Sequence, residues 1–355
     1  MKIKLAILEH DKNYLSRVIT AFNNRFADKL QVYSFTKADE VTYSTIKEAK
    51  IDVLISSDHF DIDFSQIPKA CAFAYFVESP GIEQYNDRPA ICKFQKADLI
   101  YKEILNIFSE VAANISGVSL SGDETSRVVL FTSVAGGVGS STVAAAYAKF
   151  LAQKGQKPLY LNMEILGNSN VFFSGNGQYT FSDIIYAVKS KKTNLVMKLE
   201  SCVKQDDSGV SFYDPCSLPI DMTELNPEEI ASIIRTLKTT NSYSHIVIDA
   251  DFSLDSRTMA MLRAASDVVL VADGSAVSNS KFKAFYDAFS ILEKQQDLRV
   301  MSKLHIVYNK FSNKTSTELP VEGLDVLGGI PKFEHASVKQ VVDQISTMDV
   351  FKTFI

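Results

Sequence analysis

Short hydrophobic runs alternate with amphipathic stretches along the first third of the chain. Apolar, β-branched runs predict strands at 3–8, 32–35, 53–57, 73–77 and 90–93. Segments with helical spacing of apolar residues predict helices at 11–26, 43–50 and 98–113. Strands that alternate with helices at this spacing predict an α/β unit with a parallel sheet.

The stretch that follows, residues 115–126, is polar and rich in Ser and Gly, which is typical of a linker. From Arg127 the alternation resumes, with predicted strands at 128–132, 159–161, 211–213, 245–249, 267–272, 304–309 and 326–327. Helices are predicted at 143–151 and 337–347, and a helical pair at 181–199. We therefore predict two α/β domains, each a doubly wound parallel sheet, at 1–115 and 127–355, joined by a linker at 116–126.

Composition narrows the class of protein. A chain of 355 residues is long enough for two domains, and its 46% hydrophobic and 22% charged residues are ordinary for a globular protein. The formal net charge of -5 does not favour nucleic acid as a partner. Four widely spaced cysteines predict reduced thiols, and no apolar run approaches the roughly 18 residues of a membrane span. We expect a cytoplasmic protein without a transmembrane segment.

The most informative segment is 128–142, where a predicted buried strand leads into a glycine-rich loop and then into a helix. Gly136, Gly137 and Gly139 permit a tight turn whose N–H groups converge on a phosphate. The hydroxyl residues that open the helix at its positive dipole end are Ser140, Ser141 and Thr142. A full Walker loop carries Lys where this chain has Ser140. The segment indicates nucleotide binding and argues against vigorous hydrolysis.

A carboxylate, Asp249, ends the apolar strand at 246–249, at the edge where open α/β sheets bind ligands. In phosphate-loop proteins such a carboxylate helps to hold Mg²⁺ through water, while the hydroxyl at the helix start coordinates the ion directly. Here these roles fall to Asp249 and Ser141. The alternative is a helix cap or a solvated strand end, which its pairing with the loop disfavours.

Five segments in order resemble the ParA/MinD family of ATPases over about 127–355. Residues 133–142 resemble its deviant Walker motif, 161–167 its Asp-x-Asp switch and 249–289 its Walker B strand and the strand after it. Tyr308-Asn-Lys and Gly329-Ile-Pro-Lys resemble its two base-contacting segments. The resemblance implies a P-loop fold that binds ATP and Mg²⁺ and forms a homodimer through this domain.

The same resemblance assigns the site residues. The nucleotide-binding set comprises Ala135, Gly136, Gly137, Val138, Gly139, Ser140, Ser141, Thr142, Asn309, Ile330 and Pro331. Metal binding falls to Ser141, Glu164 and Asp249, and catalysis to Asn162 and Asp249. Asn309 is expected to read the adenine edge through its amide, with a plain turn residue as the alternative. The aromatic C-terminus, with Phe351, Phe354 and Ile355, is expected to dock into the core.

Three departures from the family pattern bear on hydrolysis. Ser140 replaces the lysine that neutralises phosphate charge, and Ala135 replaces the signature lysine that reaches the partner's site. Asn162 and Glu164 stand where the switch has two aspartates. Each such charge-assisted contact contributes about 1.5–3 kcal/mol, so we expect slow or absent ATP hydrolysis. Candidate replacement cations are Arg257 and Lys281, with solvated helix-face cations as the alternative.

The first domain resembles a response-regulator receiver whose acidic pocket is degraded. Glu9 and His10 stand where an acidic pair would bind Mg²⁺, Ser57 beside Asp58 stands at the phospho-acceptor, and Lys93 matches the phosphate-binding lysine. Ordinary phosphorylation is therefore not expected.

A degenerate receiver fused to such an ATPase resembles the CpaE/TadZ branch, which positions type IVb (Tad) pilus assembly. The resemblance implies partners in pilus and secretion machinery and recruitment to a polar membrane complex. The alternatives are an ATPase that cycles with a stimulating partner and a nucleotide-independent scaffold.

Overall fold

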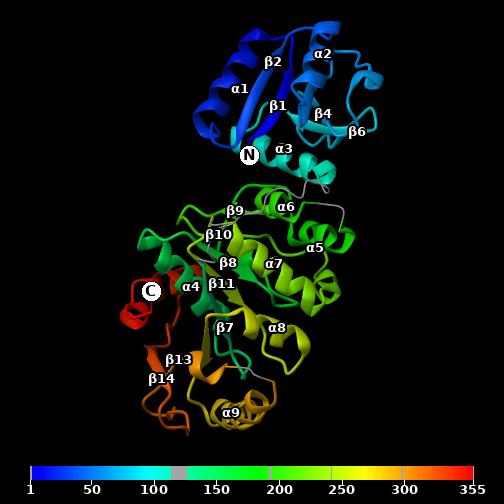
Figure 1. Cartoon of the computed structure of the whole chain (residues 1–355). Coiled ribbons are helices and arrows are strands. Elements are labelled where there is room, and N and C mark those ends of the chain that lie inside the picture. The colour runs from blue at the N-terminus through cyan, green and yellow to red at the C-terminus, as the bar shows by residue number, and fades with distance from the viewer. Residues whose placement is uncertain (1, 113–125, 192–193, 241, 297–298, 355) are drawn as a thin grey trace. The chain divides into compact units, whose positions relative to one another are not determined.

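The structure is a computed structural model that describes residues 2–112, 126–191, 194–240, 242–296 and 299–354 (Figure 1). Its internal contacts divide the chain into two units, the first made of 1–119 with 187–202 and the second of 120–186 with 203–355. Almost all of the predicted linker at 116–126 lies outside the described residues.

The first unit contains a six-stranded sheet. Its strands, in spatial order, are β2 (Leu30–Phe35), β1 (Ile3–Leu8), β3 (Val53–Ser57), β4 (Ala72–Val77), β6 (Arg88–Cys92) and β5 (Gln84–Tyr85). Every neighbouring pair is parallel except the β5–β6 hairpin at one edge. The five strands predicted from apolar runs are confirmed. The sequence analysis missed β5, because two residues carry no periodic signal.

Helices cover both faces of this sheet. They are α1 (Lys12–Arg25), α2 (Glu40–Glu48) and α3 (Ala97–Val111). The helix α6 (Leu195–Cys202), grouped with this unit by its contacts, packs against α3. The Asp11 side chain caps α1 by accepting from two N–H groups of the first turn. Residues such as Phe22 of α1 and Phe108 of α3 share one core cluster with the sheet, while Ile46 of α2 belongs to the cluster on the other face.

The second unit contains an eight-stranded sheet. Its strands, in spatial order, are β14 (Asp325–Ile330), β13 (Leu304–Asn309), β12 (Asp267–Ala272), β7 (Arg127–Thr132), β11 (His245–Asp249), β8 (Pro158–Asn162), β10 (Ser211–Phe212) and β9 (Lys204–Gln205). Only the β9 pairing is antiparallel among the described pairs. The two predicted doubly wound α/β domains are thus confirmed, each with a short antiparallel edge strand.

The helices of this unit are α4 (Ser140–Gln153), α5 (Phe181–Ser190), α7 (Pro227–Thr239), α8 (Ser256–Ala264), α9 (Ala276–Gln296) and α10 (Val338–Ser346). In Figure 1, α4 and the red C-terminal segment lie on one side of the sheet, and α7 and α8 on the other. Short 3-10 turns occur at Phe64–Gln66, Ser169–Val171, Pro219–Glu224, Met301–Lys303 and Asp349–Phe351. None of the described helices is long and apolar enough to span a bilayer.

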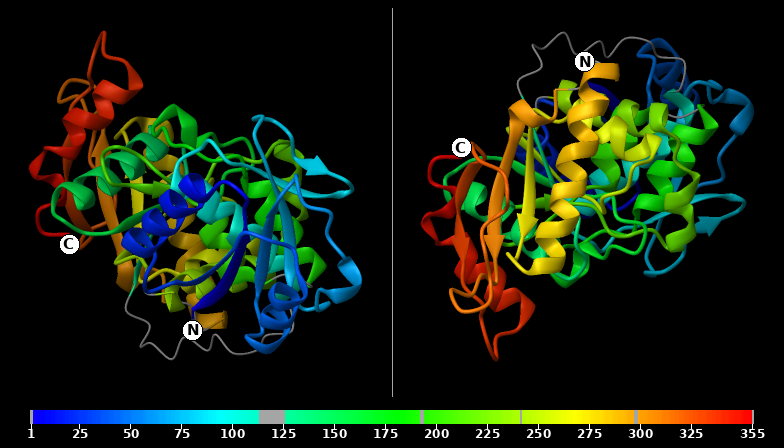
Figure 2. Two further views of the ribbon diagram at one scale, coloured as in Figure 1. Left: turned by 90° about the horizontal axis from the view of Figure 1, so that it is seen from above. Right: turned by 90° about the horizontal axis from the view of Figure 1, so that it is seen from below.

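The helix α4 is buried along most of its length and packs against α10 (Figure 2). Its Tyr147 contacts the rings of Phe351 and Phe354, which are both buried. The prediction that the C-terminal aromatic residues dock into the core is confirmed for these two, while Ile355 lies outside the described residues. This packing fixes α4 beneath the loop that follows the central strand β7.

Candidate functional site

The loop between β7 and α4 has the backbone shape of a phosphate cradle. Gly137 and Gly139 adopt left-handed φ angles of 77° and 88°, which a side chain would strain. A Cβ at Gly139 would also lie 2.6 Å from the Asn309 amide nitrogen. The helix α4 begins after Gly139 without a side-chain cap. Its first-turn N–H groups therefore lack a side-chain acceptor and form a site for an anion.

Two buried side chains hold this loop in place from below. Val138 and Ala135 are both part of the core cluster that includes α4. Ser133 adds a hydrogen bond from its hydroxyl to the Ala135 carbonyl, at 2.9 Å. Because Ala135 is buried and short, it presents no charge on the outer face of the loop where a lysine would.

Five polar residues come together where β8 and β11 end and α4 begins. The Tyr160 hydroxyl donates to Oδ2 of Asp249 at 2.6 Å, and the Asn162 amide donates to the same oxygen at 3.4 Å. The Ser141 hydroxyl donates to Oε1 of Glu164 at 3.1 Å. The predicted residues Ser141, Asn162, Glu164 and Asp249 therefore lie in one cluster, to which the structure adds Tyr160.

Burial dominates the electrostatics of this cluster. Asp249 is fully buried, and burial, reinforced by the negative charge of Glu164, raises the pKa of its carboxyl well above the usual range. Burial also raises the pKa of Glu164, with a further contribution from the charge of Asp251. The site thus gathers several acidic groups at one end of the sheet.

Within the described part of the chain, three buried oxygens at this end of the sheet have no hydrogen-bond partner, namely Oδ1 of Asp249, Oγ of Ser140 and Oγ1 of Thr132. Buried polar atoms of this kind are rare unless a ligand or water completes them. A carboxylate, two hydroxyls and an uncapped helix start are the donor set that a phosphate with its Mg²⁺ requires. The residues present therefore fit a magnesium nucleotide.

Asn309 and its neighbour Lys310 contact the loop from the end of β13. The Asn309 amide donates to the Val138 carbonyl at 2.7 Å, and the Lys310 ammonium donates to the Gly137 carbonyl at 2.8 Å. Lys310 adopts a left-handed φ of 58°, which turns its side chain back over the loop. The Asn309 amide group thus braces the loop in this structure.

Lys310 is a cation at the loop that the sequence pattern did not single out. The predicted candidates for replacing the absent lysines, Arg257 and Lys281, lie in the first turn of α8 and at an exposed position of α9, and their role stays a prediction. Among the described contacts of the loop, the cationic one comes from Lys310. The available signal was its position directly after Asn309.

The predicted base-contacting pair Ile330 and Pro331 lies beside Asn309. β14 pairs with β13 so that Ile330 is opposite Asn309. The Ile330 side chain is fully buried in the core, whereas Pro331 is exposed.

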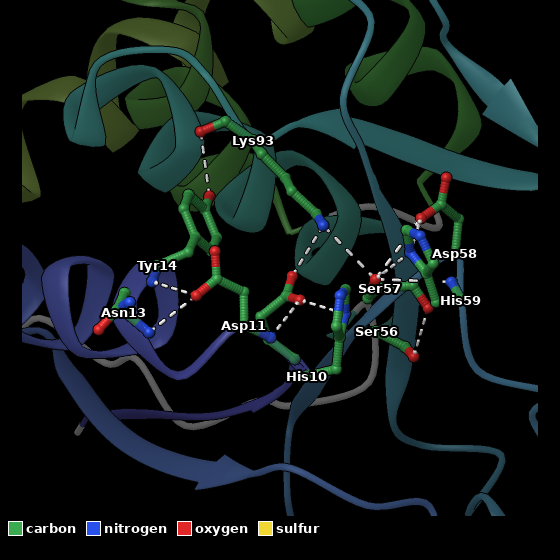
Figure 3. Close-up of polar contacts among 10 residues, drawn as sticks. His10, Asp11, Asn13, Tyr14, Ser56, Ser57, Asp58, His59 and Lys93 are labelled. Carbon is green, nitrogen blue, oxygen red and sulfur yellow. Dashed lines mark hydrogen bonds and ion pairs between the residues drawn. The ribbon is translucent and has the colours of Figure 1, made fainter.

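The receiver-like pocket of the first unit is built differently (Figure 3). Nζ of Lys93 lies 2.9 Å from Oε2 of Glu9, and both side chains are buried. The same ammonium donates to the hydroxyl of the buried Ser57, at 3.4 Å. Lys93 therefore occupies the space between the acid and the phospho-acceptor position, where it neutralises the one buried carboxylate.

Two histidines stand at the mouth of this pocket. Nδ1 of His10 lies 2.9 Å from Oε1 of Glu9, and Nδ1 of His59 lies 2.9 Å from Oδ1 of Asp58. The centroids of their rings are 4.6 Å apart, and Figure 3 shows the two side chains next to each other. Throughout the described chain, no three His, Cys, Asp or Glu side chains gather in a way that would hold a metal ion. The pocket is a closed polar network.

Comparisons with known proteins agree with the division of the chain into a receiver-like unit and a unit that carries the glycine-rich loop. Residues 1–109 match the family model of the TadZ-like receiver domain, and residues 126–304 match the model of an AAA domain. The flagellum site-determining protein YlxH of Helicobacter pylori is 28% identical over 178 residues, which are 48% of this chain and 55% of that protein. The septum site-determining protein MinD of Escherichia coli is 26% identical over 145 residues, 41% of this chain and 52% of that one.

The match therefore spans about half the length of these curated relatives. Among solved structures, MinD complexed with Mg-ADP from Pyrococcus horikoshii is 17% identical, with a TM-score of 0.47. That alignment covers 62% of this chain and 94% of the archaeal one.

Proposed function

From a chain that belongs to the AAA-domain family of ParA/MinD-like ATPases and carries a TadZ-like receiver domain, we propose a nucleotide-dependent positioning protein. It binds ATP with Mg²⁺, turns the nucleotide over slowly or not at all, and forms a homodimer through its second domain. Its role is to position the assembly machinery of type IVb (Tad) pili.

The observation that carries the proposal is the combination of an intact phosphate cradle with missing lysines. The left-handed glycines, the uncapped start of α4 and the unpartnered oxygens of Ser140 and Asp249 support binding of a phosphate and its metal ion. Ser140 and Ala135 provide no positive charge for a transition state. Since phosphoryl transfer depends on such charge, the absence of the lysines lowers the rate of ATP hydrolysis more than the affinity for ATP.

The positioning role rests on likeness to relatives. The two curated relatives named above are called site-determining proteins, one of the flagellum and one of the septum. The match of residues 1–109 to the TadZ-like receiver domain supports pilus machinery as the partner of this chain. The closed Glu9–Lys93 pair in that domain supports a docking role that needs no phosphorylation.

Nucleotide binding is tested by equilibrium titration of the full chain with a fluorescent ATP analogue, with Mg²⁺ and with EDTA. We expect saturable binding that Mg²⁺ strengthens and that shifts the protein from monomer to dimer. A chain that binds no ATP at millimolar nucleotide would overturn the proposal. An Ala at Asp249 serves as the matched variant without the metal-binding carboxylate.

The Lys310 contact with the loop favours one alternative, an ATPase that cycles when a partner adds further charge. Phosphate release, measured with and without the pilus secretion ATPase, separates the two functions. Clear turnover that Asp249→Ala abolishes would replace the proposed function with this one. A dimer that forms without nucleotide and an empty site would instead indicate a scaffold.

A further inference from the structure

Tyr160 is a polar residue in an apolar place. It lies in the middle of β8 between Leu159 and Leu161, it is fully buried, and its ring packs near Phe172 and Phe173. A phenylalanine would fill the same volume without a hydroxyl. Burial of a hydroxyl costs free energy unless a partner accepts its hydrogen bond. The partner of Tyr160 is the carboxylate of Asp249, at 2.6 Å.

The sheet register explains how a mid-strand residue reaches that carboxylate. Tyr160 pairs with Val247, and Asn162 pairs with Asp249 on the adjacent strand β11. Side chains two residues apart on a strand point to the same face, so Tyr160, Asn162 and Asp249 share one face of the sheet. The long phenol spans the two residues of strand length that separate its backbone from the end of β11.

The hydrogen bonds on Asp249 are one-sided. Tyr160 and Asn162 both donate to Oδ2, while Oδ1 is buried and has no hydrogen-bond partner among the residues that the structure describes. Two donors on one oxygen restrict rotation of the carboxylate about its Cβ–Cγ bond. They hold Oδ1 as the atom left for a ligand.

We infer that Tyr160 is a positioning residue, which orients Asp249 so that Oδ1 is presented to the Mg²⁺ of the bound nucleotide. The inference rests on the proposed function, because it concerns the same metal. The tyrosine hydroxyl stays outside the reaction and acts through the carboxylate. Its loss therefore weakens the contribution of Mg²⁺ to nucleotide affinity.

The experiment measures the nucleotide dissociation constant in EDTA and in Mg²⁺ for the wild type and for Tyr160→Phe. The dissociation constant in EDTA divided by that in Mg²⁺ reports how much the metal strengthens nucleotide binding. This ratio is independent of turnover. We expect the ratio to fall about tenfold in Tyr160→Phe, the change that about 1.4 kcal/mol produces. Thermal unfolding of each variant reports whether the core is retained.

Tyr147→Phe is the matched control. Tyr147 is also fully buried in the same core cluster, and its hydroxyl donates to the Phe354 carbonyl at 3.0 Å. Loss of this hydroxyl is expected to lower stability but to leave the metal ratio within twofold of wild type. A fall of equal size in both variants would mean that any lost core hydroxyl has the effect, and it would overturn the inference.

A double-mutant cycle with Asp249→Asn identifies the route of the effect. In the Asn background the metal contribution is expected to be lost, and Tyr160→Phe should change the ratio no further. A metal ratio in Tyr160→Phe equal to that of wild type would overturn the inference alone. A wild-type chain without nucleotide binding would overturn the proposed function as well, so the two failures are distinguishable.

Discussion

Each of the two units buries one carboxylate at the carboxyl end of its parallel sheet, and the two are handled in opposite ways. Glu9 follows β1 and is fully buried, with the ammonium of Lys93 at 2.9 Å. Asp249 ends β11 and is equally buried, with the neutral Tyr160 phenol and the Asn162 amide on one oxygen and, among the described residues, no hydrogen-bond partner on the other. The first unit supplies its own counter-charge, whereas the second leaves that place to a ligand.

The difference separates the closed pocket at Glu9 from the candidate binding site at Asp249. In a buried ion pair the attraction between the partners offsets the cost of taking both charges out of water, so the paired carboxylate has little left to offer a ligand. A buried charge without a counter-ion costs stability until something binds, and that cost is recovered as binding free energy. Burial alone did not distinguish Glu9 from Asp249, but their partners did.

The sharpest test of the comparison is Glu9→Gln, which leaves the Lys93 ammonium buried without its counter-charge. We expect the free energy of unfolding to fall by about 3–5 kcal/mol, measured by urea denaturation of the full chain. Adding Lys93→Met to this variant should restore most of the loss. Lys332→Met is the control, since the Lys332–Glu334 pair is exposed and contributes little. A loss below about 1 kcal/mol would contradict the structural role of the pair.

A second partnered carboxylate, Asp267 at the start of β12, extends the comparison to pH. Burial opposes ionisation there, but hydrogen bonds from His305 and Arg127 lower the pKa of Asp267 to about 2. The pKa of Asp267 is lower in the folded chain than in the unfolded chain, where it is near 3.9, so the ionised carboxylate stabilises the fold at pH values above about 3.9. This stabilisation is lost as the pH falls toward 2. The shift corresponds to about 2 kcal/mol. The difference between the unfolding midpoints at pH 6 and pH 3 should be smaller in Asp267→Asn than in wild type. An equal difference in the two proteins would refute the prediction.

Asp249→Asn should change the free energy of unfolding in the direction opposite to Glu9→Gln, although both substitutions replace a carboxylate with an amide. At pH 9, above the pKa of about 8 to which burial raises the Asp249 carboxyl, the amide removes an uncompensated buried charge, so the nucleotide-free chain should gain about 1 kcal/mol of stability. Thermal unfolding without nucleotide checks the gain. With ATP and Mg²⁺ the wild type should be stabilised further and the variant should not. A nucleotide-free variant less stable than wild type would mean that Asp249 is a structural residue like Glu9.

The smallest expected effect concerns Lys310, whose exposed side chain donates to the Gly137 carbonyl. Lys310→Met should weaken nucleotide affinity about two- to fivefold, because one solvent-screened charged contact near the loop is lost. Lys314→Met, an equal change of charge on an exposed residue of the same connection, is the matched control. Equal losses in the two variants would show a general charge effect in place of the loop contact.

Local sequence signals predicted much of the architecture. The apolar runs predicted the longer strands of both sheets, and the glycine spacing predicted the cradle after β7. The sequence analysis left α7, α8 and α9 unassigned, although the signal for α7 was present. Asn226 and Glu229 form a capping box there, and apolar residues follow at helical spacing. The two-residue strands β5 and β9 have no local signal, because only their pairing defines them.

The sequence by itself determined which charged groups of the family pattern are kept and which are lost at the candidate nucleotide site. The residue types at Ser140, Ala135, Asn162 and Glu164 are read directly from the sequence. Only the tertiary structure decided how the charges are partnered. Tyr160 and Asp249 are 89 residues apart, and Lys310 and Gly137 are 173 apart. Strand order and register bring such pairs together, and a hydrogen bond forms only within about 3.5 Å, so no local pattern encodes it.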